Sequence, residues 1–101
     1  MNKIITENIE KINEYCKRYN VKELYAIGSV VNDNFKDDSD IDLLIKFDEL
    51  SIEEYTDNYF ILHNLFQDIF KRKVDLVTDK SLNNPYFIKS IDRTKKILYA
   101  R

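Results

Sequence analysis

Three aspartates and a glycine-serine pair carry the chemistry that this sequence can offer. Asp40 and Asp42 stand at the start of an apolar run, IDLLIKF, and Asp75 lies inside a second run, KVDLVT. Gly28, the only glycine of the chain, precedes Ser29, and ten residues separate this pair from Asp40. Carboxylates are ligands for Mg²⁺ and Ca²⁺, and a glycine lets the backbone approach a phosphate closely. The pattern predicts a site for a metal ion and a nucleotide.

The spacing of the acids indicates how they could meet. Alternate residues of a strand point the same way, so Asp40 and Asp42 are expected to share a face about 7 Å apart. A neighbouring strand could bring Asp75 to that face, where three acids would repel one another without a bound cation. Two Mg²⁺ ions about 4 Å apart would align a triphosphate with an attacking oxygen. A purely structural interpretation, in which residues 38–42 are a polar loop entering a strand, leaves Asp75 unexplained.

A calcium loop of the EF-hand type is an alternative for the same acids. Asp38, Asp40, Asp42 and Glu49 fall at positions 1, 3, 5 and 12 of that pattern. The loop needs glycine at position 6 for its sharp turn, whereas this chain has Leu43 there. The sequence therefore disfavours calcium sensing.

The bulk composition bounds the class of protein. A chain of 101 residues, 44% hydrophobic and 34% charged, predicts one domain over residues 1–101. No apolar run reaches the length of a membrane span, and the single cysteine, Cys16, cannot form an internal disulfide. These features favour the cytoplasm. A net charge of -2 argues against a protein that wraps nucleic acid by bulk electrostatics.

Charge is unevenly distributed along the chain. Residues 32–49 hold seven acids against two lysines, whereas residues 71–101 hold nine bases against three acids. The acidic segment suits a cation site. The basic segment is compatible with an RNA partner, although a solvated surface is the commoner meaning of such charge.

Two helices are predicted from apolar residues at steps of three and four. One amphipathic helix is expected over residues 3–19, with Cys16 on its apolar side as a core residue rather than a nucleophile. A longer helix is expected over residues 51–71, opened by a capping box at Ser51. Its apolar stripe is wider than one sheet face needs, which indicates either burial on most sides or a partner surface. His63 on this helix is expected to be a surface or capping histidine rather than a metal ligand.

The remaining elements complete a small sheet. Apolar runs predict strands over residues 21–27, 41–47 and 73–78, and Asn84-Pro85 starts a helix that ends near Arg93. Residues 96–100 are expected to form an edge strand. The predicted fold class is therefore α+β, a small mixed β-sheet with helices packed on it.

The combination of motifs resembles a known signature. Gly28-Ser29, ten intervening residues and Asp40-Ile41-Asp42 are similar to the pattern of the DNA polymerase beta-like nucleotidyltransferase superfamily. Within it, a short chain with KVDLVT as the third-acid strand resembles the minimal nucleotidyltransferases, the MNT antitoxins that pair with HEPN-domain toxins. The likeness covers roughly residues 20–100.

This resemblance implies roles for individual residues. Asp40 and Asp42 would ligate both Mg²⁺ ions, and Asp75 would hold the catalytic ion and help activate the attacking hydroxyl. Gly28 and Ser29 would bind the triphosphate of ATP. Members of this group transfer AMP from ATP, in toxin-antitoxin pairs to a tyrosine of the partner toxin. The chain is therefore expected to be an antitoxin enzyme that acts on a HEPN-domain toxin.

One segment departs from the family pattern. A small residue followed by Ala-Arg-Gly usually comes after Gly-Ser, whereas this chain has Val30-Val31-Asn32-Asp33. Lys73, which shares a predicted face with Asp75, or Lys36 could supply the missing positive charge, so Lys73 is expected to bind the nucleotide. The alternative function is a weakened member of the same fold that neutralises its partner by binding alone. Self-association and an RNA or antibiotic acceptor stay open.

Overall fold

We describe the chain from a computed structural model that covers residues 2–32 and 35–101. Its elements, in order, are α1 (Lys3–Thr6), α2 (Ile9–Arg18), β1 (Val21–Ile27), the 3₁₀ turn η1 (Gly28–Val31), β2 (Ile41–Phe47), α3 (Ile52–Phe70), β3 (Val74–Thr78), the 3₁₀ turn η2 (Asp79–Ser81), α4 (Pro85–Thr94) and β4 (Lys96–Ala100). The predicted strands and the helices over 51–71 and 84–93 are confirmed.

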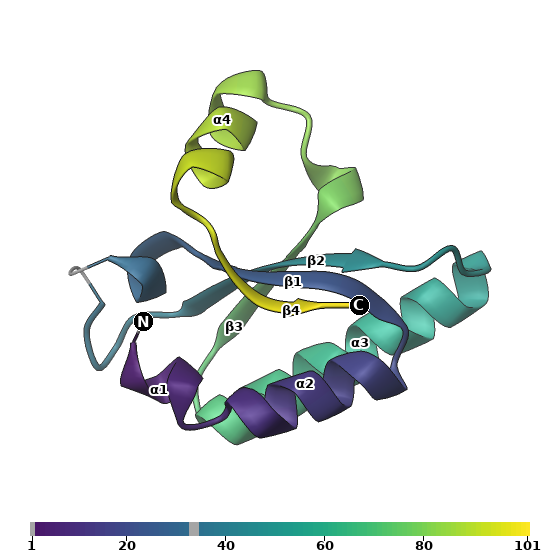
Figure 1. The fold of residues 1–101 in the computed structure, drawn as a ribbon, viewed down its shortest axis with the longest axis horizontal. Helices are drawn as coiled ribbons and strands as arrows, with labels where there is room; N and C mark the ends of the chain where they lie inside the picture. Colours follow the sequence, from purple (N-terminus) through teal and green to yellow (C-terminus); the bar gives the residue numbers. More distant parts are fainter. Residues whose placement is uncertain (1, 33–34) are drawn as a thin grey trace.

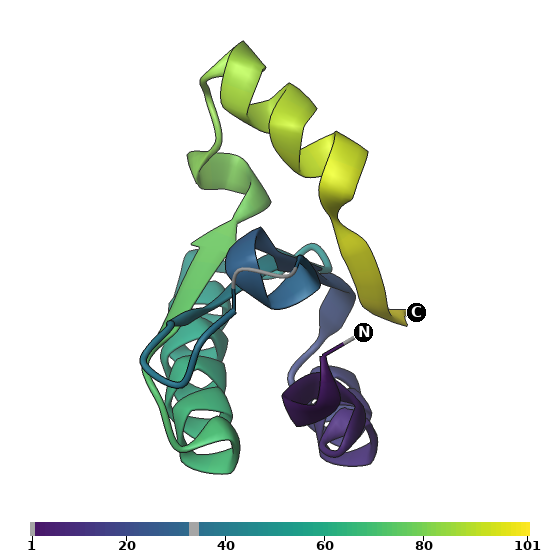
Figure 2. The ribbon, with the colours of Figure 1, turned by 90° about the vertical axis from the view of Figure 1, so that its left-hand side faces the viewer.

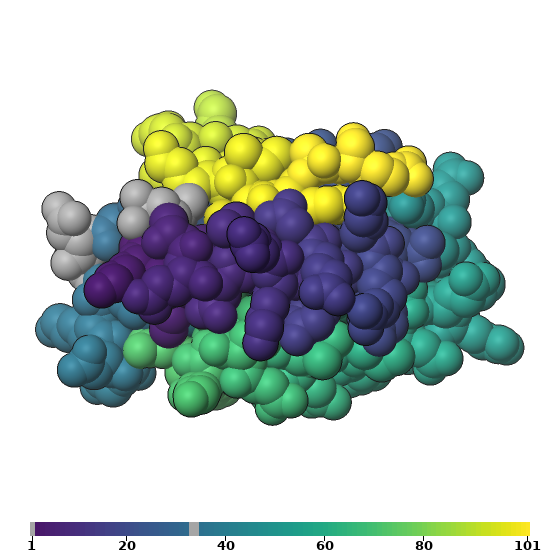
Figure 3. All heavy atoms as spheres, turned by 60° about the horizontal axis from the view of Figure 1, so that its bottom comes forward, coloured from purple at the N-terminus to yellow at the C-terminus, as the bar shows by residue number. Residues whose placement is uncertain are grey.

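The strands form one mixed sheet in the order β3-β2-β1-β4. β1 pairs antiparallel with both β2 and β4, whereas β2 and β3 run parallel and are joined through α3. Helices α1, α2 and α3 cover one face of the sheet, and α4 stands over the other (Figure 1). Figure 2, turned by 90°, and the space-filling view in Figure 3 show α2 and α3 side by side beneath the sheet. This arrangement confirms the predicted α+β architecture.

The prediction of a single helix over residues 3–19 is wrong, because the segment is broken between α1 and α2. Asn2 caps α1 by accepting from the Ile4 amide at 2.9 Å. The Asn8 side chain donates to the Ile4 carbonyl at 2.8 Å and so competes with the helical hydrogen bonds at this point. Ile5, Ile12 and Cys16 are buried on both sides of the break, which explains why the apolar period continued across it.

The core lies between the sheet and helices α1 to α3. In β2, Ile41, Leu43 and Ile45 are fully buried on the helical side, as their alternation predicts. Cys16 is fully buried in the same cluster, and this burial raises the pKa of its thiol to about 12. The reading of Cys16 as a core residue is therefore confirmed. On the opposite face, Leu44 packs with Ile27 and with Ile91 of α4.

Helix α3 also secures β3, which is an edge strand of the sheet. The Ile41 amide donates to the Lys73 carbonyl. Since the main-chain groups of successive strand residues point to opposite edges, those of Val74 point away from β2 and have no partner strand in the described part of the chain. His63 Nε2 lies 2.9 Å from the Val74 carbonyl oxygen, and Gln67 accepts from the Val74 amide at 3.3 Å. Tyr59 donates to the Leu76 carbonyl at 2.7 Å. His63 therefore caps an outward carbonyl of the edge strand and not a helix end. Side chains of α3 hold the strand that carries Asp75.

In the described ranges 2–32 and 35–101, none of the helices has both the length and the apolar character that a membrane span requires.

Candidate functional site

Gly28 sits at a sharp turn between β1 and η1. Its φ of +70° is in the left-handed region, and a Cβ at this position would lie 2.5 Å from Asp42 Oδ2. Only glycine meets both conditions without strain. The segment that follows is a four-residue 3₁₀ turn rather than an α-helix, and its Ser29 carbonyl accepts from the Asn32 amide. Gly28 therefore allows the chain to pass directly beside the Asp42 carboxylate.

Asp42 and Asp75 are register partners on the parallel strands β2 and β3. Both side chains point to the sheet face on which α4 lies, and both line one cleft. Partial burial raises the pKa of Asp42, and the nearby negative charges of Asp75 and Asp40 raise it further. The fold thus brings together two carboxylates that are far apart in the sequence.

Asp40 lies just outside the strand that was expected to carry it. Sheet pairing starts at Ile41, whose amide donates to the Lys73 carbonyl, so Asp40 stands exposed at the end of the preceding loop. Arg72 holds this loop: its Nη1 donates to the Lys36 and Ser39 carbonyls at 3.2 and 2.9 Å, and its guanidinium lies 4.7 Å from the centroid of the Phe35 ring. Arg72 is a positioning residue that the sequence did not reveal.

The acids fit a magnesium ion by donor chemistry but do not form a closed cage. Among the residues that the structure describes, no three His, Cys, Asp or Glu side chains form a group that could hold a metal ion. Mg²⁺ is commonly bound by one or two carboxylates, with water and substrate phosphates completing its shell. The Asp42 and Asp75 pair meets that requirement, and a cation would relieve the repulsion that raises the pKa of Asp42.

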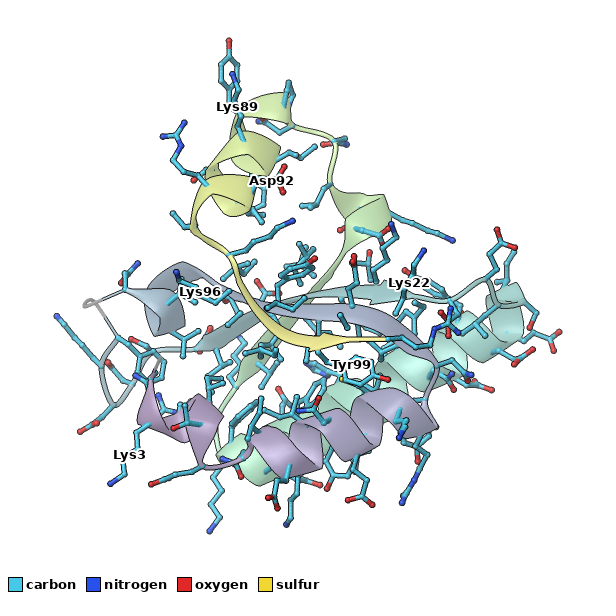
Figure 4. All side chains as sticks on the ribbon, viewed as in Figure 1. Lys3, Lys22, Lys89, Asp92, Lys96 and Tyr99 are labelled. Atoms are coloured by element: carbon cyan, nitrogen blue, oxygen red, sulfur yellow. The ribbon has the colours of Figure 1, made fainter. Side chains whose placement is uncertain are left out.

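We call the hollow beside these acids the Gly28 cleft. Its volume is about 570 Å³, and its wall includes Gly28, Asn32, Asp42, Asp75, Ser90, Arg93, Thr94 and Lys96. The acids come from the sheet, whereas Arg93 and Lys96 come from α4 and the start of β4; Lys96 lies where α4 meets β4, close to η1 (Figure 4). The cleft therefore has an acidic wall and a basic wall.

Three of the predicted site residues, Ser29, Asp40 and Lys73, are not among the residues that line the Gly28 cleft, although the charge of Asp40 is close enough to Asp42 to raise its pKa. Asp33 is outside the described residues. Arg93 and Lys96, by contrast, were not predicted as site residues. The only signal for them in the sequence was the excess of basic residues over 71–101.

Comparisons with known proteins bear on the family and the fold of this chain. A family model described as "Polymerase beta, Nucleotidyltransferase" matches residues 10–101. "Putative protein adenylyltransferase MJ1379" of Methanocaldococcus jannaschii is 36% identical over 89 residues, covering 87% of this chain and 88% of the relative. "Protein adenylyltransferase MntA" of Thermococcus cleftensis is 32% identical over 84 residues, covering 77% of this chain and 81% of the relative.

Solved structures match over nearly the whole chain. A "putative minimal nucleotidyltransferase" has a TM-score of 0.71 at 22% identity and covers 95% of both chains. A chain of a toxin-antitoxin structure with AMP-PNP has a TM-score of 0.70 at 21% identity, covering 93% of this chain and 74% of that one. A chain of the complex between the tri-AMPylated Shewanella oneidensis HEPN toxin and an MNT antitoxin has a TM-score of 0.64 at 19% identity, covering 95% and 72%. These similarities confirm the predicted fold.

Proposed function

The chain belongs to the polymerase beta nucleotidyltransferase family, and from this membership we propose that it transfers AMP from ATP to a hydroxyl group of a partner protein. The observation that carries the proposal is the register pair Asp42 and Asp75, which lines the same cleft as the Gly28 turn. Relatives named protein adenylyltransferase support the choice of AMP as the group transferred.

ATP is the proposed donor, bound in the Gly28 cleft. The triphosphate lies between the turn at Gly28, where the backbone can approach it, and the cationic side chains of Arg93 and Lys96. These two residues provide the positive charge that the segment after Gly28-Ser29 lacks. Ser29 and Lys73 stay predicted nucleotide ligands. The AMP-PNP in a structural neighbour supports an ATP-like donor.

Asp42, Asp75 and Asp40 would hold Mg²⁺ together with phosphate oxygens of the nucleotide. The metal would supply neutralisation of the negative charge on the transferring phosphoryl group. Asp75 is exposed at the edge of the cleft, so its carboxylate can accept a hydrogen bond from an incoming hydroxyl.

The proposed reaction balances without another reactant. The acceptor oxygen attacks the α-phosphorus of ATP and forms a new P–O bond, while the α-β phosphoanhydride bond breaks and pyrophosphate leaves. The hydroxyl proton passes to Asp75 and then to water. Arg93 and Lys96 stabilise the charge that grows on the leaving pyrophosphate.

The proposed acceptor is a HEPN-domain toxin, so the proposed role of this chain is that of an antitoxin. We place this activity in the cytoplasm and propose that residues 1–101 act as one domain. The support comes from structural neighbours that are complexes of an MNT antitoxin with a HEPN toxin, one of them tri-AMPylated. A tyrosine is the acceptor residue we propose. The second candidate is neutralisation by binding alone, which the Val30-Val31-Asn32 segment favours because it contains no basic side chain beside Gly28.

One experiment separates the two candidates. The chain is mixed with the HEPN-domain protein encoded beside it, Mg²⁺ and ATP labelled on the α-phosphate. Transfer predicts label on the partner that is lost in Asp42→Asn and retained in Asp68→Asn, an exposed acid on α3 outside the cleft. A stable complex without label supports binding alone. Absence of both label and complex refutes both candidates.

A further inference from the structure

Arg72 joins the loop in front of β2 to the loop in front of β3. Its Nη1 donates to the carbonyl of Ser39, the residue before Asp40, at 2.9 Å. On the other side of Asp40, the Ile41 amide donates to the Lys73 carbonyl at 3.0 Å. The main chain around Asp40 is therefore fixed on both sides by two successive residues of the segment that leads from α3 into β3.

The same segment leads to Asp75, the acid on the neighbouring strand. Asp75 follows Lys73 by two residues and is the register partner of Asp42. Because β2 and β3 run parallel, both strands begin at the end of the sheet where Arg72 lies. One side chain at this end thus controls where Asp40 stands relative to the two acids that line the Gly28 cleft.

The guanidinium of Arg72 is itself held in place. It lies 4.7 Å from the centroid of the Phe35 ring, and Phe35 packs against the core. Lys36 and Ser39 close a turn, in which the Ser39 amide donates to the Lys36 carbonyl and the Lys36 amide donates to the Ser39 hydroxyl, both at 3.0 Å. Arg72 Nη1 donates to the carbonyls of both residues. The turn is therefore anchored to the core through this one side chain.

The donors of Arg72 bind carbonyl groups rather than carboxylates. Asp37, Asp38 and Asp40 are exposed acids of the same loop, yet in the described part of the chain no ion pair joins Arg72 to any of them. An arginine paired with Asp40 would compete with a cation for that carboxylate. Here the loop is fixed through its main chain, so the Asp40 carboxylate stays available to a metal ion.

We propose that Arg72 sets the affinity of the site for Mg²⁺ by holding Asp40 beside Asp42 and Asp75. This inference rests on the proposed function, in which these acids bind the metal. Removing a group that orients metal ligands without touching the ion commonly weakens metal binding by about 10–100-fold. The positive charge of Arg72 acts in the opposite direction, because a cation near the site repels Mg²⁺. Positioning and charge therefore predict effects of opposite sign for Arg72→Ala.

The test uses Mn²⁺ as the probe, since carboxylate sites that suit Mg²⁺ also suit Mn²⁺, which broadens nearby amide signals of the ¹⁵N-labelled full chain. Saturable broadening is expected at Asp42 and Asp75. Arg72→Ala should raise the dissociation constant for Mn²⁺ by about tenfold or more. Arg72→Met keeps an unbranched stem without donors or charge and should show the same loss. Arg18→Ala, at an exposed position of α2, should leave the constant unchanged.

A double-mutant cycle with Asp40→Asn identifies the route of the effect. If Arg72 acts through Asp40, Arg72→Ala should change the affinity for Mn²⁺ by less than about twofold in the Asp40→Asn background. A general structural role would weaken binding equally in both backgrounds. The amide spectrum of each variant before Mn²⁺ is added reports whether it is folded.

The outcomes separate this inference from the proposed function. Tighter or unchanged Mn²⁺ binding in folded Arg72→Ala and Arg72→Met would overturn the role of Arg72 while the metal site stands. An equal loss with and without the Asp40 carboxylate would overturn it as well. Absence of saturable broadening at Asp42 and Asp75 in the unsubstituted chain would refute the proposed metal-dependent transfer and this inference with it.

Discussion

Replacing Gly28 with alanine is expected to destabilise the chain and disturb the acidic site together. An alanine held at φ +70° pays about 1–2 kcal/mol for the left-handed conformation. Its Cβ would lie 2.5 Å from Asp42 Oδ2, so the carboxylate must leave its rotamer at a cost of about 1 kcal/mol. The reduced freedom of the unfolded chain returns about 0.5 kcal/mol. The net loss is therefore about 2 kcal/mol, equivalent to a fall in Tm of roughly 8–16 °C for a domain of this size.

Urea denaturation followed by circular dichroism measures this loss, and a double-mutant cycle locates its cause. In an Asp42→Ala background the contact is gone but the backbone strain remains. Gly28→Ala should therefore cost about 1 kcal/mol less there than in the unsubstituted chain. Ser29→Ala, one position along the same turn, serves as the control and should change stability by less than about 0.5 kcal/mol.

Two results would refute this reasoning. An equal cost of Gly28→Ala in both backgrounds would mean that its Cβ does not meet Asp42. A neutral Gly28→Ala variant would mean that the turn does not need a left-handed residue at all. Either outcome would remove the argument that this glycine exists to let the chain pass beside the carboxylate.

Three further predictions concern other parts of the chain. Burial raises the pKa of Cys16 from 9.0 to about 12, so above pH 9 the unfolded thiol ionises while the folded one keeps its proton. The free energy of unfolding, relative to that of Cys16→Ala, should then fall as pH rises from 9 towards 12, by up to about 1.4 kcal/mol per pH unit. Urea denaturation of both proteins measures it, and a difference in midpoint that does not change with pH would contradict this prediction. Lys71 follows the last residue of α3 with φ +56°, a left-handed conformation that glycine adopts without steric cost. Lys71→Gly should therefore raise the free energy of unfolding by about 0.5–1 kcal/mol. A loss of stability would show that the side chain of Lys71 matters more than its backbone conformation. Arg93→Ala and Lys96→Ala should each weaken ATP binding about tenfold by calorimetry, and a larger effect of Lys73→Ala would favour the nucleotide ligand predicted from the sequence.

Local pattern was enough to predict most elements. The period of two in residues 41–47 and the capping box at Ser51 depend on neighbours along the chain, so β2 and α3 were found close to their actual bounds. The break at Asn8 was not predicted because Ile5 and Ile12, on either side of it, both remain buried and so preserve the helical spacing of apolar residues. A side chain that bonds to the preceding turn leaves no trace in hydrophobic periodicity.

The site was predictable only in part. Its acidic residues lie in strands that can be recognised from local sequence, whereas its basic residues reach the cleft through tertiary packing. Asp42 and Asp75 could be nominated from alternation within two strands, although their pairing depends on the parallel register that starts at Ile41 and Val74. Arg93 and Lys96 reach the cleft only because Ile91 packs α4 against the sheet. No local pattern around these two basic residues distinguishes them from other solvated charges in the last thirty residues.

The bonds from α3 to β3 have a consequence for how other molecules can meet this edge. An exposed edge strand normally offers a row of free main-chain groups to which a foreign strand can add. Here His63 and Gln67 bond the carbonyl and the amide of Val74, Tyr59 donates to the Leu76 carbonyl, and Ser81 donates to the Thr78 carbonyl at 2.8 Å. Because these three carbonyls already accept hydrogen bonds, the edge disfavours the addition of a foreign strand, and a molecule that binds here is recognised by its side chains more than by its backbone.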